Sequence, residues 1–263
     1  MKQSRRSAIR MGIPPNLHHP VRDAAPIVPY PDLSSLEKAA VEDAIVEAWR
    51  RLPAAAIRRN LPLDTAPEEP LTRLLRDELD TLRRDASQPV PGFSEDAFQR
   101  IPESEAVPDA AGRLDPFISF YPDLVFRPVK TPRQVVHDVK YGLFVECKIV
   151  DQSKDHHSIR YYCKEGIRRF VAGEYAAAMP SAMMVAYVRG PSSIPSHLGP
   201  YLEKPASLSA YETTQKPSPV ARRGQPEGHE LFSSKHRRAQ VRVWSLHPPG
   251  DIELTHLWLR LPK

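Results

Sequence analysis

The segment Leu143-Phe-Val-Glu-Cys-Lys-Ile-Val150 contains two charged residues inside an otherwise apolar run. Its length and composition predict a strand that is part of a buried sheet. Because successive side chains of a strand point to opposite faces, Glu146 and Lys148 share one face and Cys147 points to the other. Two charges in such a strand are costly unless they pair or hold a metal ion. The segment therefore predicts a buried strand with a charged site on it.

Short apolar runs before this segment predict an antiparallel meander. They cover residues 117–120 and 124–129 and are separated by turns that contain proline and lysine. Asp123 stands at the head of the second run, directly after Tyr121-Pro122. Helical spacing follows the meander, within residues 158–177, and residues 182–188 then form an almost unbroken apolar run. A helix followed by a buried strand predicts a crossover unit.

Two amphipathic helices are predicted on the N-terminal side of the meander. Apolar residues recur at helical spacing over residues 35–52, and a stripe of leucines marks residues 70–84. Residues 94–101 form a further helical turn or two in this interpretation. Residues 1–33 have no apolar period and are expected to be an irregular or disordered arm. Both helices need a partner for their apolar faces, and the leucine stripe is expected to pack on the sheet.

The C-terminal part is rich in proline and serine before it becomes strand-like again. Residues 190–230 are expected to be a long surface connection, and residues 241–246 and 252–261 two strands. The predicted organisation is then an arm at 1–33, a helical segment at 34–65, a core at 66–190, and a Pro-rich connection with C-terminal strands packed on the core at 191–263.

Charge, hydropathy and cysteine content indicate which classes of protein the chain can belong to. The 263 residues include 37 Lys and Arg against 32 Asp and Glu, and the resulting +5 leans toward a polyanionic partner. No apolar run reaches the roughly 18–20 residues that cross a bilayer, so a membrane protein is not expected. The two cysteines cannot build a disulfide framework, and the first residues carry arginines without an apolar region after them. We therefore expect a cytoplasmic protein.

The charged residues of the predicted meander suit phosphodiester hydrolysis. Two carboxylates, Asp123 and Glu146, can hold a hard divalent cation such as Mg²⁺ or Mn²⁺ and leave positions open for water and phosphate. The cation lowers the pKa of a bound water and neutralises charge on the phosphate. A nearby lysine, here Lys148, can orient the water or stabilise the developing charge.

At these residues the chain resembles the PD-(D/E)XK nuclease superfamily, which has the restriction-endonuclease-like fold. Pro122-Asp123 matches the first half of the motif and Glu146-Cys147-Lys148 the second half, 23 residues later. The resemblance covers residues 66–190 and implies an α/β core of helix, three-strand meander, helix and strand, with an N-terminal helical segment and a C-terminal strand pair around it.

The same resemblance implies roles for individual residues. Asp123 and Glu146 would ligate the metal, the backbone carbonyl of Cys147 would join them, and Lys148 would serve the attacking water. Many members carry a further glutamate near the start of the first core helix. Glu69 is the best match for it, Glu68 the second and Glu78 the third.

Two groups of basic residues are candidates for contacts with nucleic acid. Arg160, Lys164 and Arg168 recur every four residues along one side of the helix after the meander. Lys235, His236 and Arg237 form a second basic cluster before a predicted strand. A solvated surface is the alternative for each group. Phosphate contacts would position the chain without reading sequence.

The function that these patterns favour is a Mg²⁺-dependent nuclease that acts on DNA rather than RNA. Only the analogy with the fold that the chain resembles implies a place in a bacterial restriction or anti-phage system. A homodimer or a complex with a partner subunit would suit such an enzyme. The alternative is a non-cleaving subunit that keeps the nuclease fold and binds nucleic acid or assembles with a partner. A third interpretation makes Glu146 and Lys148 a structural ion pair, Asp123 a turn residue and Glu69 a favourable charge in the first turn of a helix.

Overall fold

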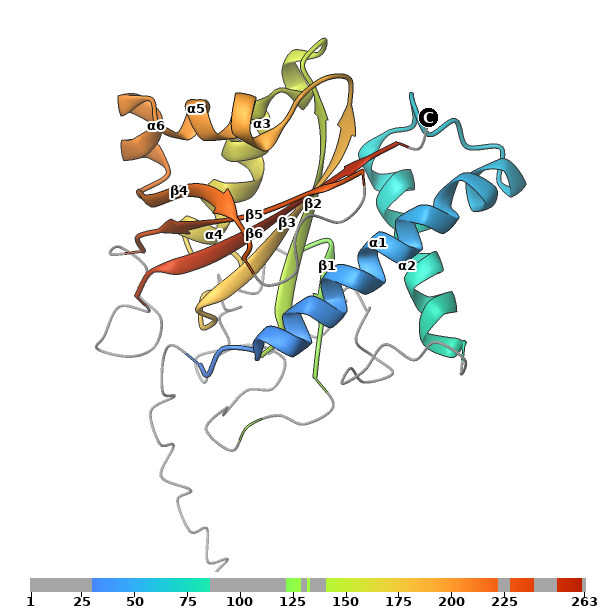
Figure 1. The fold of residues 1–263 in the computed structure, drawn as a ribbon, viewed down its shortest axis with the longest axis horizontal. Coiled ribbons are helices and arrows are strands. Elements are labelled where there is room, and N and C mark those ends of the chain that lie inside the picture. The colour runs from blue at the N-terminus through green and yellow to red at the C-terminus, as the bar shows by residue number, and fades with distance from the viewer. Residues whose placement is uncertain are drawn as a thin grey trace, which may run out of the picture.

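A six-stranded mixed sheet forms the centre of the molecule (Figure 1). The computed structural model describes residues 30–85, 122–128, 132, 141–221, 228–238 and 250–261. The strands lie in the order β1-β2-β3-β6-β5-β4. Their bounds are β1 Leu124–Phe126, β2 Leu143–Asp151, β3 Ser181–Arg189, β4 Thr213–Pro219, β5 Glu230–His236 and β6 Ile252–Arg260. β2, β3 and β6 run parallel, and the outer strands pair antiparallel.

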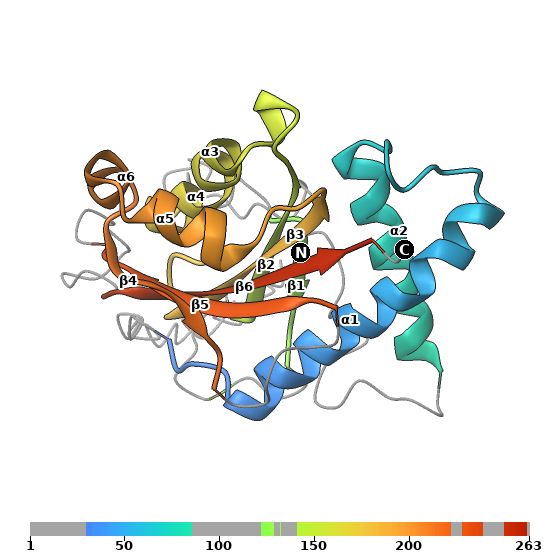
Figure 2. The ribbon, with the colours of Figure 1, turned by 45° about the horizontal axis from the view of Figure 1, so that its top comes forward.

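Helices cover both faces of the sheet (Figure 2). One face carries α1 (Ser35–Arg58) and α2 (Glu68–Arg84). The other carries a series of short helices, which are η3 Asp155–His157, α3 Ile159–Tyr162, η4 Cys163–Ile167, α4 Arg168–Val171, η5 Ile194–Leu198, α5 Gly199–Leu202 and α6 Pro205–Ala210. The architecture is therefore α/β, with three layers.

Local chemistry explains where the two long helices begin. The Ser34 hydroxyl accepts a hydrogen bond from the Glu37 N–H, and the Glu37 carboxylate accepts one from the Ser34 N–H. These two bonds cap the start of α1. α2 begins at Glu68 after Pro67 and has two acidic residues in its first turn. Negative charge stabilises the N-terminal end of a helix because it complements the helix dipole. The predicted leucine stripe of α2 is buried against α1 and β2.

The strand register separates the residues of the two faces. On the side of α1, the ring of Trp49 stacks on Tyr187 of β3, with centroids 5.2 Å apart and planes 4° apart. On the other side, Tyr162 of α3 meets Trp258 of β6 edge-on, with centroids 5.8 Å apart. Glu146 and Lys148 pair in register with Met184 and Ala186. Because Met184 packs beneath the turn η4, both charged residues belong to the face that carries α3 and α4.

Several predictions about local structure are confirmed. The segment 143–150 is a buried strand, and β2 and β3 are parallel neighbours connected through α3, η4 and α4, as the predicted crossover requires. β1 pairs antiparallel with β2, as a meander requires, but it is shorter than predicted. α1 continues past Pro53 to Arg58, six residues beyond its predicted end.

Other expectations are corrected or cannot be compared. Residues 194–219, expected within a surface connection, form η5, α5, α6 and β4. The basic cluster at residues 235–237, expected before a strand, instead begins inside β5, which ends at His236 and pairs with β6 along its whole length. The predicted elements at residues 1–29, 94–101, 117–120 and 241–246 lie outside the described residues. Among the helices that the structure describes, none combines the length and the apolar composition that a bilayer span requires.

Candidate active site

The candidate site lies where β1 stops covering the edge of β2. Pairing between these strands ends at Leu124 opposite Val145. Beyond that point, in the described part of the chain, two side-chain carboxylates accept hydrogen bonds from backbone N–H groups at the edge of β2. Asp123 accepts the Cys147 N–H through Oδ2 at 2.7 Å, and Glu68 accepts the Ile149 N–H through Oε2 at 3.0 Å. The first residue of α2 and the residue before β1 thus meet at neighbouring amides of β2.

The ammonium group of Lys148 lies at the centre of this cluster. Its Nζ is 2.7 Å from Glu146 Oε1, 2.8 Å from Glu68 Oε1 and 2.8 Å from the carbonyl oxygen of Cys147. An ammonium has three N–H donors, so these three oxygens use all of them. Glu146 and Lys148 are buried, with 2% and 6% of their surfaces exposed, whereas the Glu68 side chain is 28% exposed.

Burial and the neighbouring charges together set the pKa values of Glu146 and Lys148. Burial raises the pKa of Glu146 to about 8, and the charge of Asp123 adds to the rise, although Lys148 opposes it. Burial alone would lower the pKa of Lys148, but the carboxylates of Glu146, Glu68 and Asp123 outweigh burial and raise it. Lys148 is therefore protonated at neutral pH, and Glu146 is a carboxyl group that gains from a further nearby cation.

A second cation approaches Glu146 from the helical layer. Nη1 of Arg169, in the first turn of α4, is 3.8 Å from Glu146 Oε1 and donates a hydrogen bond to the hydroxyl of Tyr175. Nη2 bonds to Glu165 at 3.3 Å. Arg169 follows the π-helical turn η4, where Gly166 packs against Met184 with no space for a side chain between them. This close approach brings the helix down onto the part of the sheet that carries Glu146.

The structure brings together Asp123, Glu146, Lys148 and Glu68 and leaves the favoured glutamate of α2 outside. The side chain of Glu69 is 78% exposed and pairs with Arg73 at 2.8 Å. Glu78 pairs with Arg58 at 3.4 Å. Glu68 occupies the place instead, because α2 begins at residue 68 and its first side chain reaches the edge of β2. Arg169 was not among the predicted residues, since helical spacing grouped Arg168 with Arg160 and Lys164.

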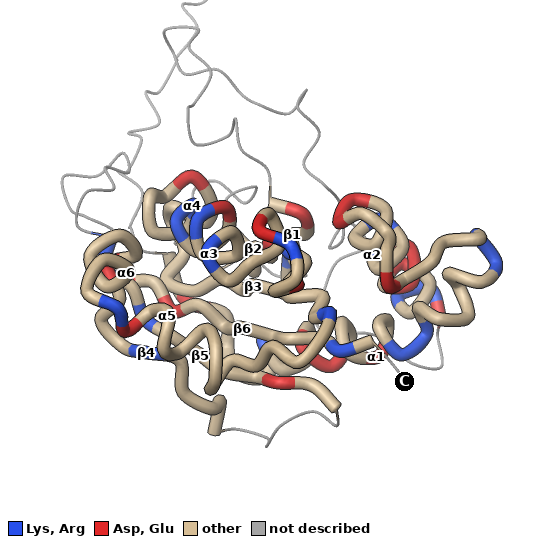
Figure 3. Tube along the Cα trace, turned by 90° about the horizontal axis from the view of Figure 1, so that it is seen from above, with Lys and Arg blue, Asp and Glu red and all other residues tan. Residues whose placement is uncertain are grey.

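The predicted row Arg160, Lys164 and Arg168 is exposed along α3, η4 and α4. Figure 3 shows Lys and Arg positions in the region of α3 and α4 on the same side of the molecule as the acidic positions drawn beside the labels of β1 and β2. Lys164 pairs with Glu165 at 3.2 Å. The row is therefore a basic surface close to the cluster.

The second basic group is corrected at one position. Lys235 and Arg237 are exposed, but His236 is fully buried in β5, where Nδ1 lies 2.8 Å from the carbonyl oxygen of Tyr211. Nε2 lies 2.8 Å from the hydroxyl of Ser234. Strand alternation explains the difference, because residues 235 and 237 point away from the face to which His236 points. His236 is thus unable to contact nucleic acid from this position.

The donor atoms of the cluster fit a hard cation. Among the described residues, no three His, Cys, Asp or Glu side chains are grouped so as to hold a metal ion by themselves. The cluster instead combines carboxylate oxygens with the carbonyl of Cys147, and Mg²⁺ binds such oxygen donors together with water. The Lys148 ammonium, in contact with three of these oxygens, marks the point at which a positive charge is stabilised. The residue types present therefore fit Mg²⁺ or Mn²⁺.

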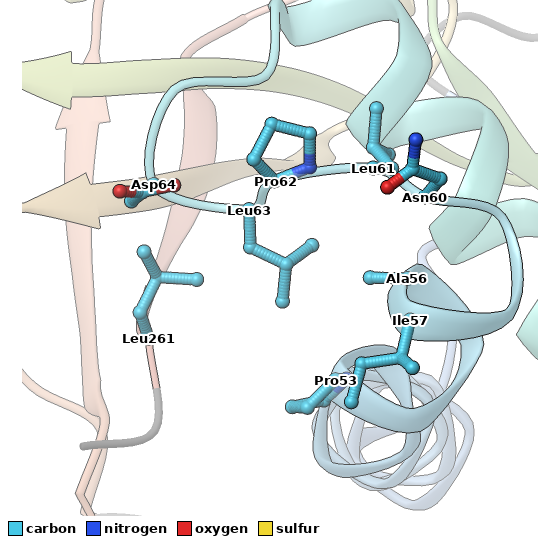
Figure 4. A pocket seen from close by; sticks show the side chains of 9 residues that line it. All are labelled: Pro53, Ala56, Ile57, Asn60, Leu61, Pro62, Leu63, Asp64 and Leu261. Atoms are coloured by element: carbon cyan, nitrogen blue, oxygen red, sulfur yellow. The ribbon is translucent and has the colours of Figure 1, made fainter.

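An open groove of about 800 Å³ lies elsewhere, between the end of α1, the loop that follows it and Leu261 (Figure 4). Its lining is mainly apolar and includes Pro53, Ile57 and Leu63. None of the residues of the charged cluster contributes to it. The groove is therefore separate from the candidate active site.

Comparison of the chain with protein-family models, with curated proteins and with solved structures gave no match.

Proposed function

We propose that this protein is a metal-dependent nuclease that hydrolyses phosphodiester bonds, with DNA favoured over RNA as its substrate. The observation that carries the proposal is the cluster at the edge of β2, where Lys148 contacts Glu146, Glu68 and the Cys147 carbonyl while Asp123 holds the adjacent amide. The order α2, β1, β2, α3 to α4 and β3 also suits the restriction-endonuclease-like core that the motif resembles.

In such a site the residues would have different roles. Asp123, Glu146 and the carbonyl of Cys147 would hold Mg²⁺ or Mn²⁺, which when bound supplies an activated water and neutralises charge on the phosphate. Lys148 stays protonated because the surrounding carboxylates raise its pKa, so it acts as a hydrogen-bond donor and a positive charge, not as a base. Glu68, whose side chain is partly exposed, would accept a proton from an attacking water.

The test is cleavage by the purified chain. Plasmid, linear duplex DNA and RNA would be incubated with Mg²⁺, with Mn²⁺ or with EDTA, and the products separated on gels. We expect divalent-dependent cleavage that Asp123→Asn and Glu146→Gln abolish. Glu69→Gln is the matched control, because it removes an exposed carboxylate next to Glu68 without touching the cluster. Full activity of both carboxylate variants at the same metal concentration would rule out this site.

A thermal shift separates the enzyme from a non-cleaving subunit that keeps the fold. A cation that binds the native state raises the melting temperature, and loss of its ligands removes that rise. We expect Mg²⁺ or Mn²⁺ to raise the melting temperatures of the wild type and of Glu69→Gln equally. The melting temperature of Glu146→Gln should not change. Nucleic-acid binding with neither cleavage nor a metal-dependent shift would favour the subunit.

A further inference from the structure

We propose that Arg169 is the residue of this site that binds a backbone phosphate of the substrate, and that Tyr175 holds its guanidinium in position. The inference rests on the proposed function, and it names the part of the substrate that the site recognises. It implies a polynucleotide held by its sugar-phosphate backbone, with no reading of base sequence at this contact.

The hydrogen bonds of Lys148 leave the binding of phosphate to another cation. All three N–H donors of Lys148 are directed at Glu146, Glu68 and the Cys147 carbonyl, and the side chain is 8% exposed. Any phosphate contact by Lys148 would first break one of these bonds. The arginine that approaches the same carboxylate has no such restriction.

Arg169 keeps donors available and is partly open to solvent. Of its five guanidinium N–H groups, hydrogen bonds within the described residues use one toward Tyr175 and one toward Glu165. The 3.8 Å between Nη1 and Glu146 Oε1 is a charge contact beyond hydrogen-bond length. With 27% of the side chain exposed, the remaining donors can reach a ligand at the border of the cluster. A guanidinium also matches the oxygens of a phosphate in a forked geometry.

The position of Arg169 relates the phosphate to the reacting centre. Its guanidinium adjoins Glu146, one of the carboxylates proposed to hold the cation, so a bound phosphate would lie next to that cation. Arg168 and Lys164 are exposed on the same helical segment, so basic side chains continue along the surface beside Arg169. A backbone entering over α4 would meet this surface first and Arg169 at the site.

Tyr175 restrains the guanidinium from two directions. Its hydroxyl accepts a hydrogen bond from Nη1, and its ring lies under the guanidinium, with Cζ of Arg169 5.5 Å from the ring centroid. Tyr175 is itself buried and packs edge-on against Phe170. It is a positioning residue, because it is proposed to act on the substrate only through Arg169.

Binding without cleavage tests the contact directly. Fluorescence anisotropy in EDTA would follow labelled single- and double-stranded DNA, and RNA of the same sequence, at several salt concentrations. We expect Arg169→Gln to weaken binding about tenfold, as loss of a charged hydrogen bond does, and to reduce the log–log salt slope by about 1. Arg51→Gln is the matched control, since Arg51 is 29% exposed and also pairs with a glutamate four residues earlier, but lies on α1.

Single-turnover cleavage in Mg²⁺ adds a readout for position. Arg169→Lys keeps the charge without the fork, so we expect its binding to be nearly restored and its cleavage rate to stay low. Tyr175→Phe should raise the substrate concentration needed for half-maximal cleavage and leave the salt slope unchanged. Circular dichroism and melting curves identify the variants that fold. If Arg169→Gln is unfolded, the cleavage rate of Arg169→Lys tests the phosphate contact instead.

The outcomes separate the two proposals. If the wild type cleaves and Arg169→Gln binds and cleaves like Arg51→Gln, the phosphate contact is wrong and the nuclease remains. If Arg169→Gln is unfolded and Arg169→Lys cleaves at the wild-type rate, the contact is wrong as well. If the wild type cleaves no substrate with either metal, the proposed function fails, and the anisotropy series still decides whether Arg169 binds a phosphate backbone.

Discussion

At the scale of single residues, two adjacent glutamates have opposite environments. Glu68 joins Lys148 and the amide of Ile149, while Glu69 extends into solvent beside Arg73. Both residues lie in the first turn of α2, so their effects on the helix itself are similar. The pair therefore isolates the contribution of the cluster.

We expect Glu68→Gln to lower the free energy of unfolding by about 1–3 kcal/mol, because it removes one charged partner of a buried ammonium. Glu69→Gln should change it by less than about 0.5 kcal/mol, since an exposed ion pair contributes little. Urea denaturation of both variants measures the difference, and cleavage assays should show loss only for Glu68→Gln. Equal effects of the two substitutions would contradict the assignment of Glu68.

Lys148 separates turnover from metal binding. The carboxylates and the Cys147 carbonyl would hold the cation. The Lys148 ammonium is not a metal ligand, and it donates hydrogen bonds to oxygens of this same set. Lys148→Met should thus reduce cleavage strongly and leave metal affinity unchanged or higher. Calorimetric titration with Mg²⁺ or Mn²⁺, beside single-turnover kinetics, measures the two effects. Parallel loss of metal binding and cleavage would instead assign Lys148 a structural role.

At the scale of elements, the π-helical turn η4 places α4 over the site. A Cβ atom at Gly166 would lie 2.2 Å from Cε and 3.0 Å from Sδ of Met184, and both residues are buried. A single inserted methyl group here would force Met184 to move or the helix to rise from the sheet.

We expect Gly166→Ala to destabilise the fold by about 1–3 kcal/mol, the usual cost of overpacking. Gly166→Ala should cost less in a Met184→Ala background than in the wild type, because that background lacks the atoms that clash. Gly199→Ala is the control, since its Cβ would meet only the Ile194 carbonyl at 3.4 Å. Thermal melting of the single and double variants measures the coupling, and additive effects would show that the Met184 contact is unimportant.

At the scale of the whole molecule, a buried hydrogen-bonded chain connects the helical layer to β5 and β6. Ser234 Oγ lies 2.8 Å from His236 Nε2 and 2.7 Å from His256 Nε2, and His256 Nδ1 lies 2.9 Å from the hydroxyl of Tyr162. The Tyr211 carbonyl can only accept, so His236 carries its proton on Nδ1 and accepts from Ser234. Ser234 then accepts from His256, which accepts from Tyr162. The chain is complete only while both histidines are neutral.

The contribution of these two histidines to stability should therefore be lost in acid. Burial lowers the pKa of His236 to about 4 and that of His256 to about 3. The unfolded chain takes up these protons near pH 6.5, so stability falls as pH drops below 6.5 toward the folded-state values. Between pH 7 and pH 5 each histidine contributes a loss of about 2 kcal/mol, at 1.36 kcal/mol per pH unit.

The measurement is the difference between two chains. Urea denaturation at pH 7 and pH 5 would be carried out on the wild type and on His256→Gln. The free energy of unfolding of the variant should fall by about 2 kcal/mol less on acidification than that of the wild type, because one titrating group is gone. An equal loss in both chains would show that His256 is not the source of the acid sensitivity.

The local periodicity of the sequence was sufficient for most elements. The apolar runs and helical stripes predicted β2, β3, β6, α1 and α2 because burial of one face imposes a period on the chain. Glu146 and Lys148 could be chosen for the same reason, since charges inside an apolar strand stand out against that period. Asp123 could be chosen because it stands at the head of the preceding apolar run. β5 escaped prediction because its serines, lysine and histidine do not have the composition of a buried strand.

The remaining features depended on tertiary contacts between distant segments. Glu68 was distinguished from Glu69 only by the edge of β2, some eighty residues away, because both residues have the same local sequence context. Arg169 joined Glu146 because a π-helical turn shifts the helix by a fraction of a turn, which a regular helical period does not represent. His236 lies inside because β6 and the residues around Tyr211 cover it. Sequence alone thus determined which residues could carry chemistry, and the packing of β2 against α2 and α4 decided which of them meet.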